Sequence, residues 1–296
     1  MNLKRTTALV LAAAIFATPL KADIAGPYLA ARQASISSDY TEAVAYYARA
    51  IVQDPSNAQL LENAVFANVG AGDVETAARI AETYAKTGSS NQIVSLVTDI
   101  TALKDGDYSA AAEGTTQTEG LATLLEGLLQ GWALLGEGNM SAATASFKKV
   151  ADQPDFAPLA SYHEALALAQ VGDFEAADHI LSGDRDGPLT LSARGIQGHA
   201  QVLMQLERAD DAKALLDAAI AQRFNPELKA LSEKIAAGET VDYSFVTTPQ
   251  DGAAEVLYTL AAILQGRAAA EHVVIYTSLA TYLRQAHAHA LLSRAE

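Results

Sequence analysis

The hydrophobic and polar positions of this chain repeat with a period close to 34 residues. An alanine recurs at intervals of 34, 34, 32, 34 and 35 residues, and each copy ends a five-residue phrase that opens on Asp, Asn or Arg. The recurring alanines are Ala43, Ala77, Ala111, Ala143, Ala177 and Ala212. Each period predicts a first helix (helix A), a tight turn and a second helix (helix B). Such a pattern is typical of an array of stacked helical hairpins.

The turns and breaks carry their own residue signals. Gly70–Asp73 and Gly136–Asn139 place glycine where helix A ends and Asp or Asn where helix B begins. Glycine tolerates the left-handed conformation that ends a helix, and Asp or Asn caps the next one. Proline, which stops the preceding helix, marks the breaks between repeats at Pro55, Pro154, Pro188 and Pro226. Gly114–Thr116 interrupts the third helix B, which we expect to be short or weak.

Small and aromatic residues recur at fixed places within the period. Counted from the recurring alanine, these places hold Ala31, Tyr47, Ala50 and Pro55 in repeat one, Gly131 and Phe147 in repeat four, and Ala165 in repeat five. This pattern resembles the tetratricopeptide repeat (TPR) family over about residues 24–226. Repeat two departs from it, because Ala81 holds the aromatic place and Tyr84 follows three residues later.

The resemblance implies an all-α fold, a right-handed α-solenoid of stacked antiparallel helix pairs. We expect about six TPR-like repeats in residues 23–237. An unrelated alanine-rich helical bundle is the alternative, but bundles lack a fixed period.

The pattern changes after the array. We expect a loop or linker at 238–251, which either separates two parts of the chain or lies back on the solenoid. A C-terminal helical hairpin, Ala253–Leu264 and Ala268–Leu283, and an incomplete further repeat fill 252–296. The apolar face at the end of the chain predicts either self-association through residues 286–296 or a longer version of the array.

The N-terminus predicts a signal peptide at residues 1–22. Lys4 and Arg5 precede an apolar stretch from Thr7 to Pro19 that is shorter than a membrane span. We expect cleavage after Ala22 and a periplasmic or secreted protein, with no stable membrane insertion after cleavage. An uncleaved membrane anchor is the alternative.

Charge and cysteine content narrow the function classes. The formal charge is −15, and loss of residues 1–22 would remove three basic residues and change it to −18. Nucleic acid and anionic lipid need a basic surface, so neither is an expected partner. The chain has no cysteine, which excludes thiolate zinc sites, iron–sulfur clusters and cysteine nucleophiles.

Catalytic and metal-binding motifs are missing from the sequence. We find no nucleophile elbow, Walker loop, dinucleotide-binding glycine fingerprint or zincin motif. His287 and His289 would point to different faces of a helix, and Asp184 and Asp186 lack the ligand order of a calcium loop. The other histidines are expected at surface or half-buried positions. We therefore predict no catalytic, cofactor or metal residues and no enzymatic activity.

The family register directs side chains from successive A helices into the concave groove. They form an aromatic floor with arginines at its ends, which could hold an extended peptide while the arginines bind carboxylates. The predicted partner-binding groove residues are Tyr28, Arg32, Phe66, Trp132, Tyr162, Arg194, Gln197 and Gln201. In the alternative interpretation, Phe66 and Trp132 only pack against neighbouring helices.

Two functions fit these expectations. The first is a non-enzymatic protein–protein interaction scaffold in the bacterial cell envelope, which would bind another protein or a peptide segment and need no cofactor. The second is an accessory glycan- or polymer-binding component of an envelope enzyme system, with sugar rings stacked on the aromatic floor.

Overall fold

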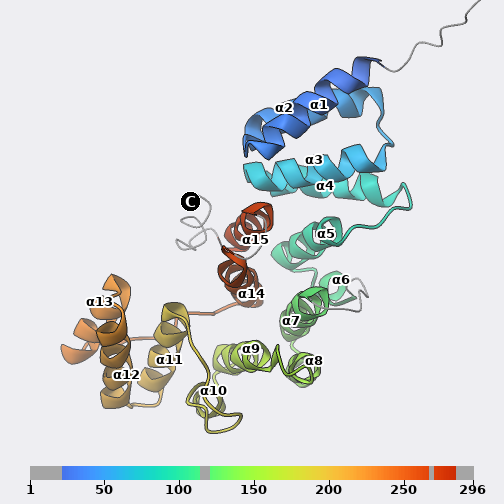
Figure 1. Ribbon diagram of the computed structural model, residues 1–296. Coiled ribbons are helices and arrows are strands. Elements are labelled where there is room, and N and C mark those ends of the chain that lie inside the picture. The colour runs from blue at the N-terminus through green and yellow to red at the C-terminus, as the bar shows by residue number, and fades with distance from the viewer. Residues whose placement is uncertain (1–21, 114–120, 267–269, 285–296) are drawn as a thin grey trace, which may run out of the picture.

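The computed structural model describes residues 22–113, 121–266 and 270–284, and in this part of the chain it contains fifteen α-helices and no strand. Consecutive helices pack as antiparallel pairs (Figure 1). The predicted fold class, an all-α solenoid of stacked helix pairs, is confirmed. The predicted signal peptide, up to residue 21, and the predicted self-association segment 286–296 lie outside the described residues.

The helices alternate as the period predicts. The A helices are α1 (Ala22–Ile36), α3 (Ala58–Ala71), α5 (Gln92–Asp105), α7 (Leu121–Gly136), α9 (Ala157–Gln170) and α11 (Ala193–Gln205). The B helices are α2 (Tyr40–Gln53), α4 (Val74–Ala85), α6 (Tyr108–Glu113), α8 (Met140–Ala151), α10 (Phe174–Leu181) and α12 (Ala209–Gln222). They are followed by α13 (Pro226–Ala236), α14 (Pro249–Leu264) and α15 (Ala270–Leu283). Six residues of helix α6 lie within the described part of the chain, and the predicted interruption at Gly114–Thr116 lies outside it.

The repeated polar phrase caps each of the first five B helices. The side chains of Asp39, Asp73, Asp107, Asn139 and Asp173 each accept a hydrogen bond from the backbone N–H three residues later, at 3.0–3.2 Å. Such caps satisfy donors that the first turn of a helix leaves unpaired. The alanine that ends each phrase is buried in every repeat, so one short motif both starts helix B and places a small buried residue on it.

The residue before each cap has a left-handed backbone. Glycine fills this place in four repeats, with φ between 78° and 87°, as Gly72, Gly106, Gly138 and Gly172. In the first and last repeats, Ser38 (φ 59°) and Glu207 (φ 58°) take the same conformation. Residues with a Cβ adopt it at a cost of about 1–2 kcal/mol. These two turns therefore carry backbone strain that the other four avoid.

Glycine permits close approach of neighbouring helices both within a repeat and between repeats. A Cβ added to Gly131 on α7 would overlap the ring of Phe147 on α8. Gly70 on α3 is equally restricted, because a Cβ there would lie 2.6 Å from Cδ1 of Tyr40 on α2. Aromatic rings thus fill the space that the missing side chains leave.

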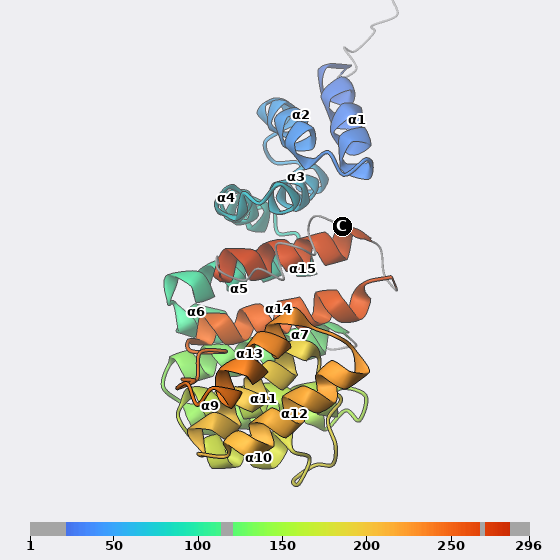
Figure 2. The same cartoon turned by 90° about the vertical axis from the view of Figure 1, so that its left-hand side faces the viewer.

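The C-terminal hairpin occupies the concave side of the solenoid. Helix α14 packs against α5, α7 and α9, and α15 packs against α3, α4 and α5. Figure 1 shows the repeats curving around α14 and α15, and Figure 2 shows the two helices crossing the stack. One connected hydrophobic core runs from Leu61 on α3 to Leu283 on α15. The segment after α13 therefore lies back on the solenoid rather than separating two bodies.

We predict that Glu207→Gly raises the free energy of unfolding by about 0.5–1 kcal/mol. Relief of the left-handed backbone strain should exceed the cost of the conformational entropy that glycine adds to the unfolded chain. Chemical denaturation measures the change. Glu207→Ala is the matched control, since it removes the exposed side chain but keeps the Cβ, and it should leave stability nearly unchanged. Equal stability of the glycine and alanine variants would contradict the strain assigned to this turn.

Candidate functional site

Four of the eight predicted groove residues contact the C-terminal part of the chain itself. Trp132, Tyr162, Arg194 and Gln201 lie on α7, α9 and α11, and each meets residues between 244 and 255. The concave surface therefore binds a segment of its own chain at the place where the sequence predicts a peptide.

Trp132 is fully buried beneath α14. A Cβ added to Gly252 would overlap the indole ring, so α14 approaches at a distance that only glycine permits. The indole Nε1 donates a hydrogen bond to Nδ1 of His163 at 3.3 Å. Burial lowers the pKa of His163 to about 3, and the ring is neutral at physiological pH. The expectation of a surface or half-buried histidine is wrong for His163 and for His199, which are 0% and 6% exposed.

A buried ion pair joins α11 to α14. The Arg194 guanidinium donates from Nη2 and Nε to Oε2 of Glu255, at 2.6 and 3.1 Å, and the Tyr162 hydroxyl donates to Oε1 at 3.2 Å. Glu255 is 1% exposed. Burial lowers the pKa of Arg194, but the Glu255 carboxylate outweighs this effect and the net pKa is raised. Burial and the same carboxylate raise the pKa of Tyr162, so its hydroxyl stays a donor.

The extended segment before α14 is bound by α11 as a peptide would be. The Gln201 side chain accepts from the Ser244 N–H at 2.9 Å, and the Gln205 amide donates to the Val241 carbonyl at 2.8 Å. The Phe245 ring packs on Gly198, where an added Cβ would lie 2.8 Å away. Side-chain amides thus pair with the backbone of an extended chain, and a glycine makes room for its aromatic anchor.

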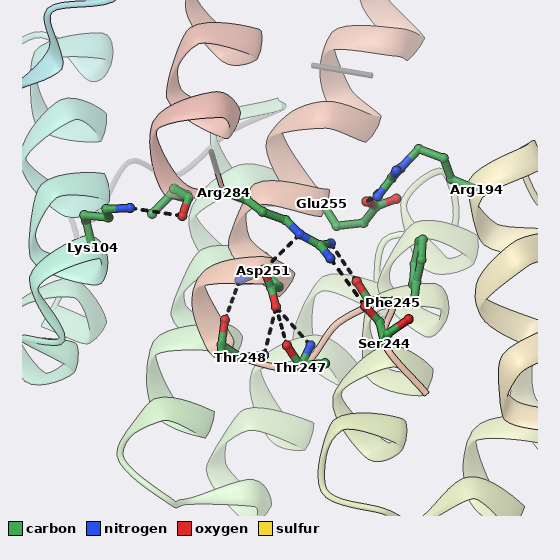
Figure 3. A network of polar contacts seen from close by, with 10 residues as sticks. Lys104, Arg194, Ser244, Phe245, Thr247, Thr248, Asp251, Glu255 and Arg284 are labelled. Atoms are coloured by element: carbon green, nitrogen blue, oxygen red, sulfur yellow. Dashed lines mark hydrogen bonds and ion pairs between the residues drawn. The ribbon is translucent and has the colours of Figure 1, made fainter. Parts of the chain in front are cut away.

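Further polar contacts fix the ends of the hairpin. Arg284, just after α15, donates to the Phe245 carbonyl at 2.7 Å and pairs with Asp251 at 3.1 Å (Figure 3). Asp251 forms a capping box with Thr248 at the start of α14. Lys104 on α5 donates to the Leu283 carbonyl at 3.3 Å. The extended segment, α14 and α15 are therefore linked into one unit.

The other four predicted residues do not join this cluster. Tyr28 on α1 packs edge-on against Tyr47 at 6.5 Å, and Arg32 on the same helix is exposed. Phe66 on α3 is partly buried against the main core, and Gln197 on α11 is partly buried. The eight residues do not form one continuous open surface, since α14 and its leading segment cover the middle of it.

Sequence patterns did not identify the partners of the cluster. Gly252 and Glu255 lie in a helix without the repeat phrase, and Glu255 is 61 residues from Arg194. No local spacing connects such residues. The one available signal was the aromatic, extended composition around Phe245.

An open pocket of about 590 Å³ lies beside the buried ion pair. Tyr162, Arg194 and Tyr258 are among its lining residues, and we call it the Arg194 pocket. Its walls come from the start of α9, the loop before α11 and the outer face of α14. They are mainly apolar, with Pro158, Leu159, Leu189, Leu191, Ala262 and Ile263. Small-molecule sites span roughly 300–1,000 Å³ and combine apolar walls with few polar groups, so this pocket has the size and lining of a ligand site.

A second, much smaller hollow contains two carboxyl groups. Asp99 on α5 and Glu126 on α7 line a space of about 20 Å³. Burial and the Glu126 charge raise the pKa of Asp99 to about 7. Within the described residues, no group of three His, Asp or Glu side chains could hold a metal ion.

Among the helices that the structure describes, none has the length and apolar character needed to cross a membrane. In comparisons with known proteins, the chain matches no protein-family model and no curated protein.

We predict that Gly252→Ala destabilises the protein by about 1–3 kcal/mol, because the new methyl group overpacks the contact with Trp132. Denaturation followed by tryptophan fluorescence measures the loss. Gly26→Ala is the control, since a Cβ there meets nothing within 4 Å. If the two variants behaved alike, α14 would not be packed on the indole.

We predict that Asp99→Asn stabilises the protein above pH 7 and that the gain disappears towards pH 4. The folded pKa of about 7 exceeds the ordinary value of 3.8. Deprotonation of this carboxyl therefore disfavours the folded state. In the unmodified protein, the free energy of unfolding falls as the pH rises through this range. Thermal unfolding of both proteins across this pH range tests the sign, and a gain independent of pH would refute the assigned burial.

Proposed function

We propose that this protein is a non-enzymatic protein–protein interaction scaffold of the bacterial cell envelope, built as a TPR-like solenoid. The predicted signal peptide, cleaved after Ala22, would make it periplasmic or secreted. The observation that carries the proposal is the binding of an extended segment and a helix by the A helices. This segment shows how the concave surface holds a polypeptide: side-chain amides pair with its backbone and a glycine admits its aromatic side chain.

Displacing the hairpin would cost an external partner more free energy than its binding is expected to supply. Six large aliphatic side chains of α14 and α15 are at least 95% buried: Val256, Leu257, Leu260, Ile275, Leu279 and Leu283. Exposing them would cost on the order of 9–18 kcal/mol as an upper estimate. A micromolar partner supplies about 8 kcal/mol. We therefore place the partner site in the Arg194 pocket, which remains open beside α14.

The glycan-binding alternative relied on a broad aromatic floor. Trp132 is fully buried under Gly252, so it offers no stacking face to a sugar. Tyr258 and Tyr162 are the aromatic residues of the pocket, and aliphatic side chains dominate around them. This composition favours an apolar protein segment over a polymer of sugars.

We predict that a photoreactive side chain at Ile263, on the pocket rim, cross-links a specific envelope protein in intact cells. Val171 is the control position, because it is similarly exposed but follows the opposite end of α9. The adduct should appear at Ile263 and not at Val171, and the identified protein, once purified, should bind the intact chain. Equal labelling at both positions, or no adduct at Ile263, would remove the pocket as the partner site.

A further inference from the structure

The extended segment at 241–248, which we call the strap, crosses α11 with buried and exposed side chains in alternation as far as Phe245. Asp242 and Ser244 are exposed, and each lies between residues that are half-buried or buried. The inward residues are Val241, Tyr243, Phe245 and Val246. A period of two is the repeat of an extended chain with one face on a surface. The strap therefore has the form of a bound peptide.

The groups that bind the strap are also held by other parts of the chain. The Arg194 guanidinium carbon lies 5.0 Å from the Phe245 ring, and the ion pair with Glu255 on α14 fixes its position. Arg284, which donates to the Phe245 carbonyl, is likewise paired with Asp251. A groove whose polar groups are already oriented binds a peptide at a lower entropic cost.

The strap and the hairpin are anchored by different contacts. Helix α14 is held by the close approach of Gly252 to Trp132, and α15 by the hydrogen bond from Lys104 to the Leu283 carbonyl. Neither contact involves a strap residue. Two strap side chains are buried, against six large aliphatic side chains in the hairpin. Release of the strap alone is therefore the less costly way to open the concave surface.

We propose that the strap is an autoinhibitory segment that occupies a peptide-binding groove on α11. The ligand of this groove is an extended segment of another protein with the pattern aromatic, any residue, aromatic, aliphatic, and it binds by displacing the strap. The inference goes beyond the proposed function, because the groove lies beneath the strap and not in the open Arg194 pocket. Either surface can fail its test without the other.

The side-chain contacts of the strap define this pattern. Gly198 leaves room for the ring of Phe245. The Tyr243 ring packs edge-on against Phe174, with 5.6 Å between the ring centroids. Both positions therefore take an aromatic side chain. Val246 is fully buried and takes an aliphatic one.

The backbone contacts of the strap suit any extended sequence. Gln201 accepts a hydrogen bond from the Ser244 N–H, and Gln205 donates to the Val241 carbonyl. Arg284 donates to the carbonyl of the next inward residue, Phe245. Because these bonds reach only main-chain atoms, they give affinity, and the aromatic and aliphatic positions give specificity.

Attachment at both ends gives the strap an advantage over a free peptide. A short tether keeps a segment at a local concentration on the order of millimolar. A free segment with the same contacts therefore binds the intact protein weakly, and it binds well once the contacts of the strap itself are weakened. This difference is what autoinhibition predicts.

The test measures binding of a fluorescein-labelled peptide with the sequence of residues 241–248 by fluorescence anisotropy. The purified proteins are the intact chain, Phe245→Ala, which weakens the strap, and Phe224→Ala, which removes an exposed phenylalanine elsewhere. We expect Phe245→Ala to bind the peptide at least tenfold more tightly than the other two. A peptide with alanine in place of its phenylalanine should bind this variant at least tenfold more weakly.

Three results would overturn the proposal. The first is equal peptide binding by the three proteins, and the second is no binding by folded Phe245→Ala. The third is a dimer of the intact chain, seen by light scattering, that Phe245→Ala abolishes, because it would assign the groove to the strap of a second copy.

A milder pair of variants tests the same claim if Phe245→Ala loses its helical circular dichroism. Ser244→Pro removes the N–H that is bound to Gln201 and leaves Phe245 in place. Asp242→Pro is the matched control, since Asp242 is exposed and its N–H forms no hydrogen bond among the described residues. Ser244→Pro should bind the peptide about fivefold more tightly than the control, the equivalent of one hydrogen bond. Equal affinities would reject the strap, and a partner cross-linked at Ile263 would remain valid.

Discussion

The contact between Gly252 and Trp132 is the constraint on which the arrangement depends. Because position 252 has no side chain, α14 approaches the indole closely enough to bury it. Helix α15, which pairs with α14, then packs against α3 and α5. Repeat arrays are usually stabilised by contacts between neighbours alone. Here the hairpin connects repeats two to five through one core, so the middle of the solenoid is stabilised across repeats as well as along them.

Polar contacts fix the position that packing allows. Burying Glu255 without a partner would be costly, so the pair with Arg194 holds α14 in one register on α11. The same arginine reaches the open pocket. One side chain therefore contributes both to the fold and to the pocket that we propose as the partner site.

The local part of this architecture could be predicted from the sequence, and the long-range part could not. Asp39, Asp73 and Asn139 cap helices because each side chain accepts a hydrogen bond from the backbone N–H three residues later. Such a bond depends only on neighbouring residues in the sequence. The groove register also identified Trp132 and Arg194 as inward-facing. What covers them depends on Gly252 and Glu255, on a helix outside the repeat pattern. Glu255 is 61 residues from Arg194, and Gly252 is farther still from Trp132. A single sequence contains no periodic signal for such a pairing.

The fluorescence of Trp132 tests the central claim most directly, because it is the only tryptophan in the chain and its burial depends on α14. The account predicts a blue-shifted emission and little quenching by iodide or acrylamide in the native protein, with full quenching after unfolding. Emission typical of a solvated indole, quenched equally before and after unfolding, would show that the hairpin does not occupy the concave side.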